Sequence, residues 1–146
     1  MIIRKSNRKE TDFIFAFSQK VIEESSMGYL KPGHHNIVTE MFEPALQNGA
    51  YYLVAEKENK LLGWILVGTT IDPYSLEEIG YLLDIYVFPD YRKSAIAKKL
   101  THEALTRLKQ DHYQKVQLSI FSGNHSTALC QQFDFKEVLT VFERPL

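Results

Sequence analysis

The segment from residue 85 to residue 100, IYVFPDYRKSAIAKKL, combines residue types that suit the binding of a phosphate group. An apolar strand leads into a turn with Pro89, and a basic segment with small residues then opens a helix. The start of a helix presents free backbone N–H groups and a partial positive charge, which together attract anions. Arg92, Lys93 and two further lysines add full charges there. The segment therefore predicts a pyrophosphate cradle at the end of a buried strand.

A second interpretation of this segment stays open at the level of local pattern. Turns between strands and helices also carry Pro, Asp and Lys for turn geometry and solubility. Close contact between phosphate and backbone usually requires glycine, and the chain has none between Val87 and Ser122.

Composition limits the function classes that remain. The length of 146 residues predicts a single domain, residues 1–146. A net charge of −1 argues against a nucleic-acid partner or a polybasic membrane anchor, and one cysteine excludes an intramolecular disulfide. No apolar run approaches the ~20 residues that span a bilayer, and the first residues lack a signal-peptide pattern. We therefore expect a cytoplasmic protein with no nucleic-acid or membrane partner.

Hydrophobic periodicity predicts strands and helices in alternation. Residues 2–4 form a short strand, Asn7 and Glu10 cap the first helix, and a second helix over residues 35–48 is kinked or split at Pro44. The predicted strands that follow cover residues 51–56, 61–69, 79–87, 115–121 and 135–143, with helices over 96–108 and 124–133. This order predicts an α/β (α+β) domain in which helices cover both faces of a mixed central sheet of about six to seven strands.

Four segments in this order resemble the GNAT acetyltransferase family over essentially the whole chain. They are MIIRKSNRKETDFIFAF, YYLVAEKENKLLGWILVG, LLDIYVFPDYRKSAIAKKL and GNHSTALCQQFDFKEV. The resemblance implies an acyl-CoA N-acyltransferase fold and an enzyme that moves an acetyl group from acetyl-CoA to a primary amine of a small molecule or peptide. The amine would attack directly in a ternary complex, without a metal. A non-catalytic acyl-CoA-binding or regulatory domain is the alternative, and a homodimer through the last strands is a further expectation.

The resemblance also implies where acetyl-CoA binds. The strand splays from its neighbour, its free main chain contacts the pantetheine arm, and the Val87 N–H stabilises the developing oxyanion. The cofactor-binding residues so implied are Ile85, Tyr86, Val87, Arg92, Lys93, Ser94, Ala95, Ile96, Ala97 and Asn124.

The chain departs from the family pattern in the cradle. Positions that favour glycine in the family carry Lys93, Ala95 and Ala97 here. A positive φ costs a non-glycine residue on the order of 1–2 kcal/mol. We therefore expect reduced affinity for acetyl-CoA, unless the charge of Lys93 offsets the loss. The family builds acceptor specificity in the loop at residues 25–33, so we expect a lid or acceptor wall there.

The catalytic candidates are one thiol, one phenol and two carboxyl groups. Cys130 stands where the family often places a tyrosine as general acid; a thiol with a pKa of about 8.5 can donate a proton, but a small buried residue is the alternative. Tyr81 falls where some members carry a glutamate, Glu78 lies just before it, and Asp84 lies within the strand. A carboxylate here can act as general base directly or through water. Asp84 can instead be structural or bind a cationic acceptor.

Overall fold

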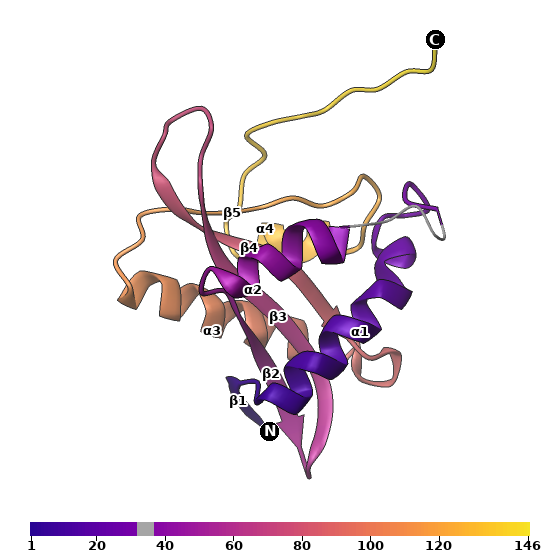
Figure 1. The fold of residues 1–146 in the computed structure, drawn as a ribbon, viewed down its shortest axis with the longest axis vertical. Helices are drawn as coiled ribbons and strands as arrows, with labels where there is room; N and C mark the ends of the chain where they lie inside the picture. The colour runs from indigo at the N-terminus through magenta and orange to yellow at the C-terminus, as the bar shows by residue number, and fades with distance from the viewer. Residues whose placement is uncertain (32–36) are drawn as a thin grey trace.

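A mixed sheet of five strands, in the order β1-β2-β3-β4-β5, forms the centre of the molecule (Figure 1). The computed structural model describes residues 1–31 and 37–146. The strands are β1 (Ile2–Lys5), β2 (Tyr51–Lys57), β3 (Lys60–Ile71), β4 (Glu78–Val87) and β5 (Val116–Leu118). The first four pair antiparallel, whereas β5 runs parallel to β4. The mixed α/β architecture is confirmed, but the prediction of six to seven strands is wrong, since the described residues form five.

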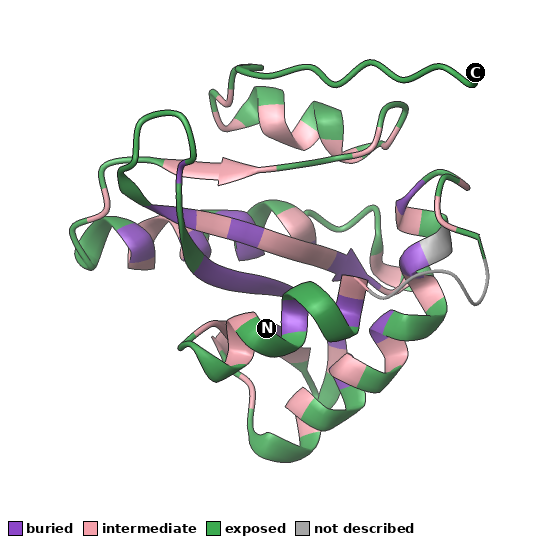
Figure 2. Ribbon diagram, turned by 45° about the horizontal axis from the view of Figure 1, so that its top comes forward, coloured by how far each residue is buried: buried purple, intermediate pink, exposed green. Residues whose placement is uncertain are grey.

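The predicted last strand, over residues 135–143, accounts for most of this difference. The structure assigns no helix or strand to residues 133–146, and Figure 2 shows the end of the chain as an exposed trace. Val138 is 69% exposed and Phe142 is 91% exposed. A strand forms only where a neighbouring strand pairs with its backbone and packs against its side chains. The predicted neighbour, residues 115–121, shortens to Val116–Leu118 and offers little edge to pair with.

Helices cover both faces of the sheet. They are α1 (Arg8–Ser25), η1 (Val38–Phe42), α2 (Glu43–Gln47), η2 (Pro89–Tyr91), α3 (Ile96–Gln110) and α4 (Ser126–Gln132). Helix α1 and η1 bury one face through a cluster that includes Ile14, Phe42 and Trp64. Helix α3 buries the other face through a cluster that includes Ile65 and Leu100. No helix within the described ranges has the length and apolar character that a membrane span needs.

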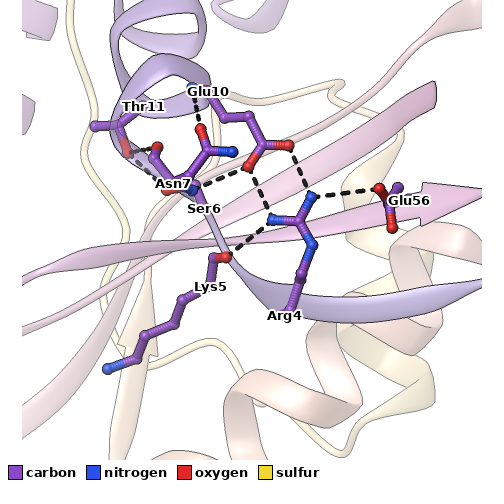
Figure 3. A network of polar contacts seen from close by, with 7 residues as sticks. All are labelled: Arg4, Lys5, Ser6, Asn7, Glu10, Thr11 and Glu56. Carbon is purple, nitrogen blue, oxygen red and sulfur yellow. Dashed lines mark hydrogen bonds and ion pairs between the residues drawn. The ribbon is translucent and has the colours of Figure 1, made fainter. Parts of the chain in front are cut away.

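The start of α1 is capped as predicted. The Glu10 N–H donates to Asn7 Oδ1 at 2.8 Å, and the Asn7 N–H donates to Glu10 Oε1 at 2.9 Å. Arg4 then donates to both carboxylate oxygens of Glu10, at 2.8 and 3.0 Å (Figure 3). A reciprocal cap satisfies two free N–H groups. The cap and the ion pair together fix the angle at which α1 leaves β1.

The predicted split at Pro44 is also present. A π-helical turn, η1, ends at Phe42, and the Glu43 N–H donates to the Val38 carbonyl. Pro44 stands in the first turn of α2, where its missing N–H removes no helical hydrogen bond. The first two residues of the predicted helix, 35 and 36, lie outside the described residues.

Candidate active site

Strands β4 and β5 separate after a short paired stretch. Residues 80–82 of β4 pair with Val116–Leu118 of β5. From residue 83 to residue 87, the ladder found within the described ranges joins β4 to β3 only. One edge of β4 is therefore unpaired over five residues, which is the splay that the family resemblance implies.

A β-bulge marks the point of separation. Leu66 of β3 faces Asp84 of β4, but the next residue, Val67, faces Leu82. Leu83 therefore has no opposite residue in β3. A bulge bends its strand and increases the local twist, so it turns the end of β4 away from β5.

The main chains of Ile85 and Val87 face the unpaired edge. The Phe88 N–H donates to the Leu62 carbonyl of β3 at 3.0 Å. Because alternate residues of an antiparallel strand direct their N–H and C=O groups to opposite edges, Ile85 and Val87 direct theirs away from β3. Arg92 Nε donates to the Val87 carbonyl at 2.8 Å, which agrees with this orientation. The Val87 N–H thus faces the gap, whereas the Ile85 N–H donates to the Asp84 carboxylate.

Tyr86 lies differently from its two neighbours. Its main chain faces β3, by the same alternation. Its ring stacks on Trp64, with 5.0 Å between the ring centroids, inside an aromatic cluster with Phe17 and Phe88. Of the three strand residues expected to contact the cofactor, the structure brings Ile85 and Val87 to the open edge and keeps Tyr86 in the core.

The segment predicted as a pyrophosphate cradle leads into α3 without glycine. Ala95 precedes the helix with φ 62° and ψ 19°, in the left-handed region. Such a conformation costs an L-residue about 1–2 kcal/mol, which explains why the family favours glycine here. Lys93 and Ser94 are exposed beside it, and Ile96 is buried. The free N–H groups of the first turn of α3 therefore face an accessible, positively charged surface.

Arg92 has protein partners at the edge of the cradle. Besides the Val87 carbonyl, its guanidinium contacts Glu24 of α1 at 3.1 Å and lies 5.3 Å from the centroid of the Tyr86 ring. These contacts tie the end of β4 to α1. The expected contact between Arg92 and a pyrophosphate stays a prediction.

A pocket of about 120 Å³ opens in the gap between β4 and β5. Strand β4 contributes Leu82, Leu83, Asp84 and Ile85 to its lining. Other lining residues come from α1, η1, β3, α3, β5, the loop after β5 and α4, among them Ile22, Ser25, Phe42, Thr101, Phe121, Asn124 and Cys130. The pocket therefore adjoins the unpaired edge of β4 and brings together four of the predicted site residues, Asp84, Ile85, Asn124 and Cys130.

Asp84 is half-buried at this pocket and is held by one buried donor. Trp64 Nε1 donates to Asp84 Oδ2 at 3.1 Å. Burial raises the pKa of Asp84 to about 6, although the hydrogen bonds from Trp64 and from the Ile85 N–H act in the opposite direction. Asp84 is the one charged side chain among the described residues that line the pocket. At neutral pH it is a carboxylate that can accept a proton.

Cys130 and Asn124 approach the pocket from α4 and the loop before it. Burial raises the pKa of the half-buried Cys130 thiol, so the group stays protonated at neutral pH and can donate. Asn124 Nδ2 donates to the Ser25 carbonyl at 2.9 Å, and Asn124 Oδ1 accepts from the Ser126 N–H at 2.8 Å. Asn124 thus joins this loop to the end of α1.

Tyr81 and Glu78 lie outside the pocket lining. The Tyr81 hydroxyl contacts Ser119 Oγ at 2.8 Å, on the paired part of β4. Glu78 is exposed at the start of β4, where its carboxylate accepts a long hydrogen bond of 3.4 Å from the Tyr113 hydroxyl. Of the four catalytic candidates, the pocket therefore brings together Asp84 and Cys130.

The structure adds two features that sequence reasoning did not find. Trp64 is a buried core residue whose indole N–H orients the Asp84 carboxylate. An aspartate inside an apolar strand needs a hydrogen-bond donor. Trp64 lies on the neighbouring strand, two residues from the residue that faces Asp84, so it could have been proposed as that donor. The loop at residues 25–31 lies against Phe121, whose ring centroid is 5.5 Å from that of Tyr29. The remaining residues of that predicted acceptor wall, 32 and 33, lie outside the described residues.

Residues 18–135 match the model of a protein family described as the acetyltransferase (GNAT) family. The chain belongs to the GNAT acetyltransferase family. No curated protein matches the sequence. Among the residues described, no three His, Cys, Asp or Glu side chains come together as a group that could hold a metal ion.

Solved structures of GNAT proteins share the fold. A candidate acetyl transferase from Pyrococcus furiosus has 21% sequence identity and a TM-score of 0.83, with 99% of each chain covered. A predicted acetyltransferase from Clostridium acetobutylicum, solved with acetyl-CoA, has 17% identity and a TM-score of 0.75, with 99% of this chain and 95% of that chain covered. AAC(6')-Iy, solved with a CoA–acetylneamine bisubstrate analogue, has 18% identity and a TM-score of 0.70, with coverage of 99% and 97%. At these identities the likeness establishes the fold.

Proposed function

We propose that this GNAT protein is an acetyl-CoA-dependent N-acetyltransferase that acts on a primary amine of a small molecule or peptide. One arrangement carries the proposal: the unpaired edge of β4 joins the α3 cradle at one end and the Asp84 carboxylate at the other. An acyl-CoA needs main-chain partners for its amide groups, a positive site for its phosphates and a reacting end near a base. The residues present fit these needs.

Acetyl-CoA would be held mainly by main-chain groups. The C=O group of Ile85 and the N–H of Val87 suit the pantetheine amides, as an added strand does. The first turn of α3 suits the pyrophosphate, with Lys93 supplying a full charge beside it. The Clostridium acetobutylicum relative, which was solved with acetyl-CoA, supports the co-substrate.

The thioester would lie near Ile85. The pantetheine arm separates the pyrophosphate from the thioester, and Val87 is the strand residue next to the cradle. Ile85 lies further from the cradle, beside Asp84 and the pocket. Because the Ile85 N–H donates to the Asp84 carboxylate, the Val87 N–H that the resemblance implies stays the predicted donor to the developing oxyanion.

Asp84 would act as the general base. The attacking amine must be neutral, and the Asp84 carboxylate accepts the proton that the nitrogen loses. Transfer from an amine with a pKa near 10.4 to a carboxylate with a pKa of about 6 costs roughly 6 kcal/mol. This cost is well below the ~16 kcal/mol barrier of an enzyme with a kcat of about 10 s⁻¹.

The neutral amine forms the new C–N bond, the C–S bond breaks, and the sulfur leaves with the bonding electrons. The nitrogen then loses a second proton as it becomes an amide, and this proton restores the Cys130 thiol after that thiol has protonated the sulfur. The Cys130 thiol can supply the proton that this sulfur takes up, since burial keeps it protonated. General acid help of this kind is worth about 10²–10⁴-fold in rate.

A non-catalytic acyl-CoA-binding or regulatory domain is the second candidate. The observation in its favour is that side chains occupy the three glycine-favoured positions of the cradle, with Ala95 in a left-handed conformation. The two functions differ in turnover. We expect release of free CoA thiol from acetyl-CoA in the presence of a panel of primary amines. Binding of acetyl-CoA without such release from any amine would favour the second candidate.

The expected homodimer also remains a prediction. The apolar side chains that such an interface would cover are those of the exposed C-terminal segment, which include Val141 and Leu146. Sedimentation analysis of the full chain and of a chain that ends at residue 136 tests it. A dimer that becomes monomeric on truncation is the expected result.

A further inference from the structure

The Asp84 carboxylate has apolar neighbours on its face of the pocket. Leu66, its opposite residue in β3, belongs to the core cluster beneath α1 and η1, so the Asp84 side chain faces these helices. The pocket residues from the same side are Ile22 of α1, Phe42 of η1 and Leu83 of β4. A ligand group that meets Asp84 therefore has hydrocarbon on these sides, and the polar groups near the carboxylate include the Trp64 N–H and the buried Tyr52 hydroxyl.

Three of the uncharged polar side chains of the pocket have partners within the protein. Thr101, Ser119 and Asn124 each form a side-chain hydrogen bond. Ser25, Ser126 and Cys130 are the other uncharged polar side chains of the described lining. Asp84 is the single charged side chain that the described lining residues contribute.

The single carboxylate restricts the charge of the ligand. A second ammonium group would have no carboxylate in the described lining to pair with, and burying an unpaired charge is unfavourable.

We infer that the acceptor is a primary amine with one positive charge on a small apolar body, such as a single aromatic ring or a short alkyl chain. The inference rests on the proposed function and narrows its acceptor. Asp84 pairs with the ammonium group, while Ile22, Phe42 and Phe121 contact the apolar body. The acceptor thus differs in class from the aminoglycoside fragment in the AAC(6')-Iy complex.

Steady-state kinetics with four acceptors tests the inference. The probes are 2-phenylethylamine and n-hexylamine, as apolar monoamines, and spermidine and neamine, as polycations. CoA release is measured with acetyl-CoA saturating. We expect kcat/KM for an apolar monoamine to exceed that for either polycation at least 100-fold. A polycation acetylated as well as, or better than, both monoamines would overturn the inference but leave the proposed function intact.

A wall variant supplies a second, independent readout. Phe121→Ala removes apolar contact from the loop after β5, so we expect a 5- to 50-fold higher KM for 2-phenylethylamine and an unchanged Kd for acetyl-CoA. Tyr74→Ala, at a site 79% exposed on the β3–β4 hairpin, is the matched control and leaves both values unchanged. An unchanged KM in Phe121→Ala would contradict the placement of the acceptor.

Failure of the proposed function gives a different result. If acetyl-CoA binds but no amine in the panel releases CoA, both the N-acetyltransferase assignment and the acceptor class are overturned. Transfer to polycations alone overturns only the acceptor class. The two failures are therefore distinguishable in one set of assays.

Discussion

The indole N–H of Trp64 donates a 3.1 Å hydrogen bond to the Asp84 carboxylate, from β3 to the neighbouring β4. Trp64 is fully buried in an aromatic cluster, so the donor has little freedom to move. The hydrogen bond stabilises the charged form of Asp84, whereas burial destabilises it. The resulting pKa of about 6 leaves the group ionised at neutral pH, yet basic enough to accept a proton.

Asp84→Asn should lower kcat/KM for the best amine by about 10²–10⁴-fold, because the general base is lost. The Kd for acetyl-CoA should stay unchanged, since the cradle and the open edge of β4 are intact. Steady-state kinetics and calorimetry measure the two quantities. Glu78→Gln is the matched control on the same strand, and we expect wild-type activity from it. The reverse pattern, an inactive Glu78→Gln and an active Asp84→Asn, would move the base to the start of β4.

Trp64→Phe should shift the acid limb of the pH profile of kcat/KM. In the wild type, activity should rise as the pH rises through about 6, the pKa of Asp84. Loss of a hydrogen bond to a charged group costs about 1.5–3 kcal/mol, so the limb should move up by roughly one pH unit or more. Tyr86→Phe alters the same aromatic cluster but keeps the Trp64 N–H that donates to Asp84. It should therefore leave the acid limb of the pH profile in place. An unmoved limb in Trp64→Phe would show that Asp84 does not set it.

The stability of the protein should depend on pH through Asp84. Its folded-state pKa of about 6 lies above the unfolded value of about 3.9, so between these pH values the folded state binds more protons. The free energy of unfolding should therefore fall as the pH rises through this window, by up to about 3 kcal/mol. The Asp84→Asn variant should not show this fall in the free energy of unfolding, because asparagine does not titrate. Urea unfolding of the wild type and of Asp84→Asn at pH 4 and pH 7 measures this effect. If the difference in the free energy of unfolding between the two proteins is the same at both pH values, the raised pKa is contradicted.

Ala95→Gly should stabilise the protein by about 0.5–1 kcal/mol. The strain of the left-handed conformation is removed, although glycine has more freedom in the unfolded chain. Acetyl-CoA should also bind severalfold more tightly, because the Cβ at the cradle is gone. Ala97→Gly, inside the first turn of α3, is the control and should destabilise the protein by up to about 1 kcal/mol. Equal effects of the two substitutions would argue against strain at residue 95.

Local features of the fold were predictable from the sequence. Asn7 and Glu10 cap α1, and Pro44 divides the second helical segment, as expected. Each depends on a few neighbouring residues or on one strong preference. The cradle segment was also predictable, since the turn at Pro89 and the start of α3 follow from adjacent residues.

Features that depend on distant pairing were not predictable. The last strand has a strand-like pattern, but the described structure gives it no neighbour to pair with. The bulge at Leu83 is a shift in register between β3 and β4, and it decides which side chains of β4 reach the pocket. For this reason the sequence alone did not decide among Asp84, Glu78 and Tyr81, whereas in the structure Asp84 is the one of the three that lines the pocket.

Isothermal titration with acetyl-CoA, with CoA and NADH as comparators, tests the central claim most directly. If the edge of β4 and the α3 cradle bind the co-substrate, acetyl-CoA and CoA should bind with micromolar Kd values, and NADH should not. Absence of binding at millimolar acetyl-CoA would mean that Lys93, Ala95 and Ala97 have closed the cradle. The fold would then serve a function other than acetyl transfer.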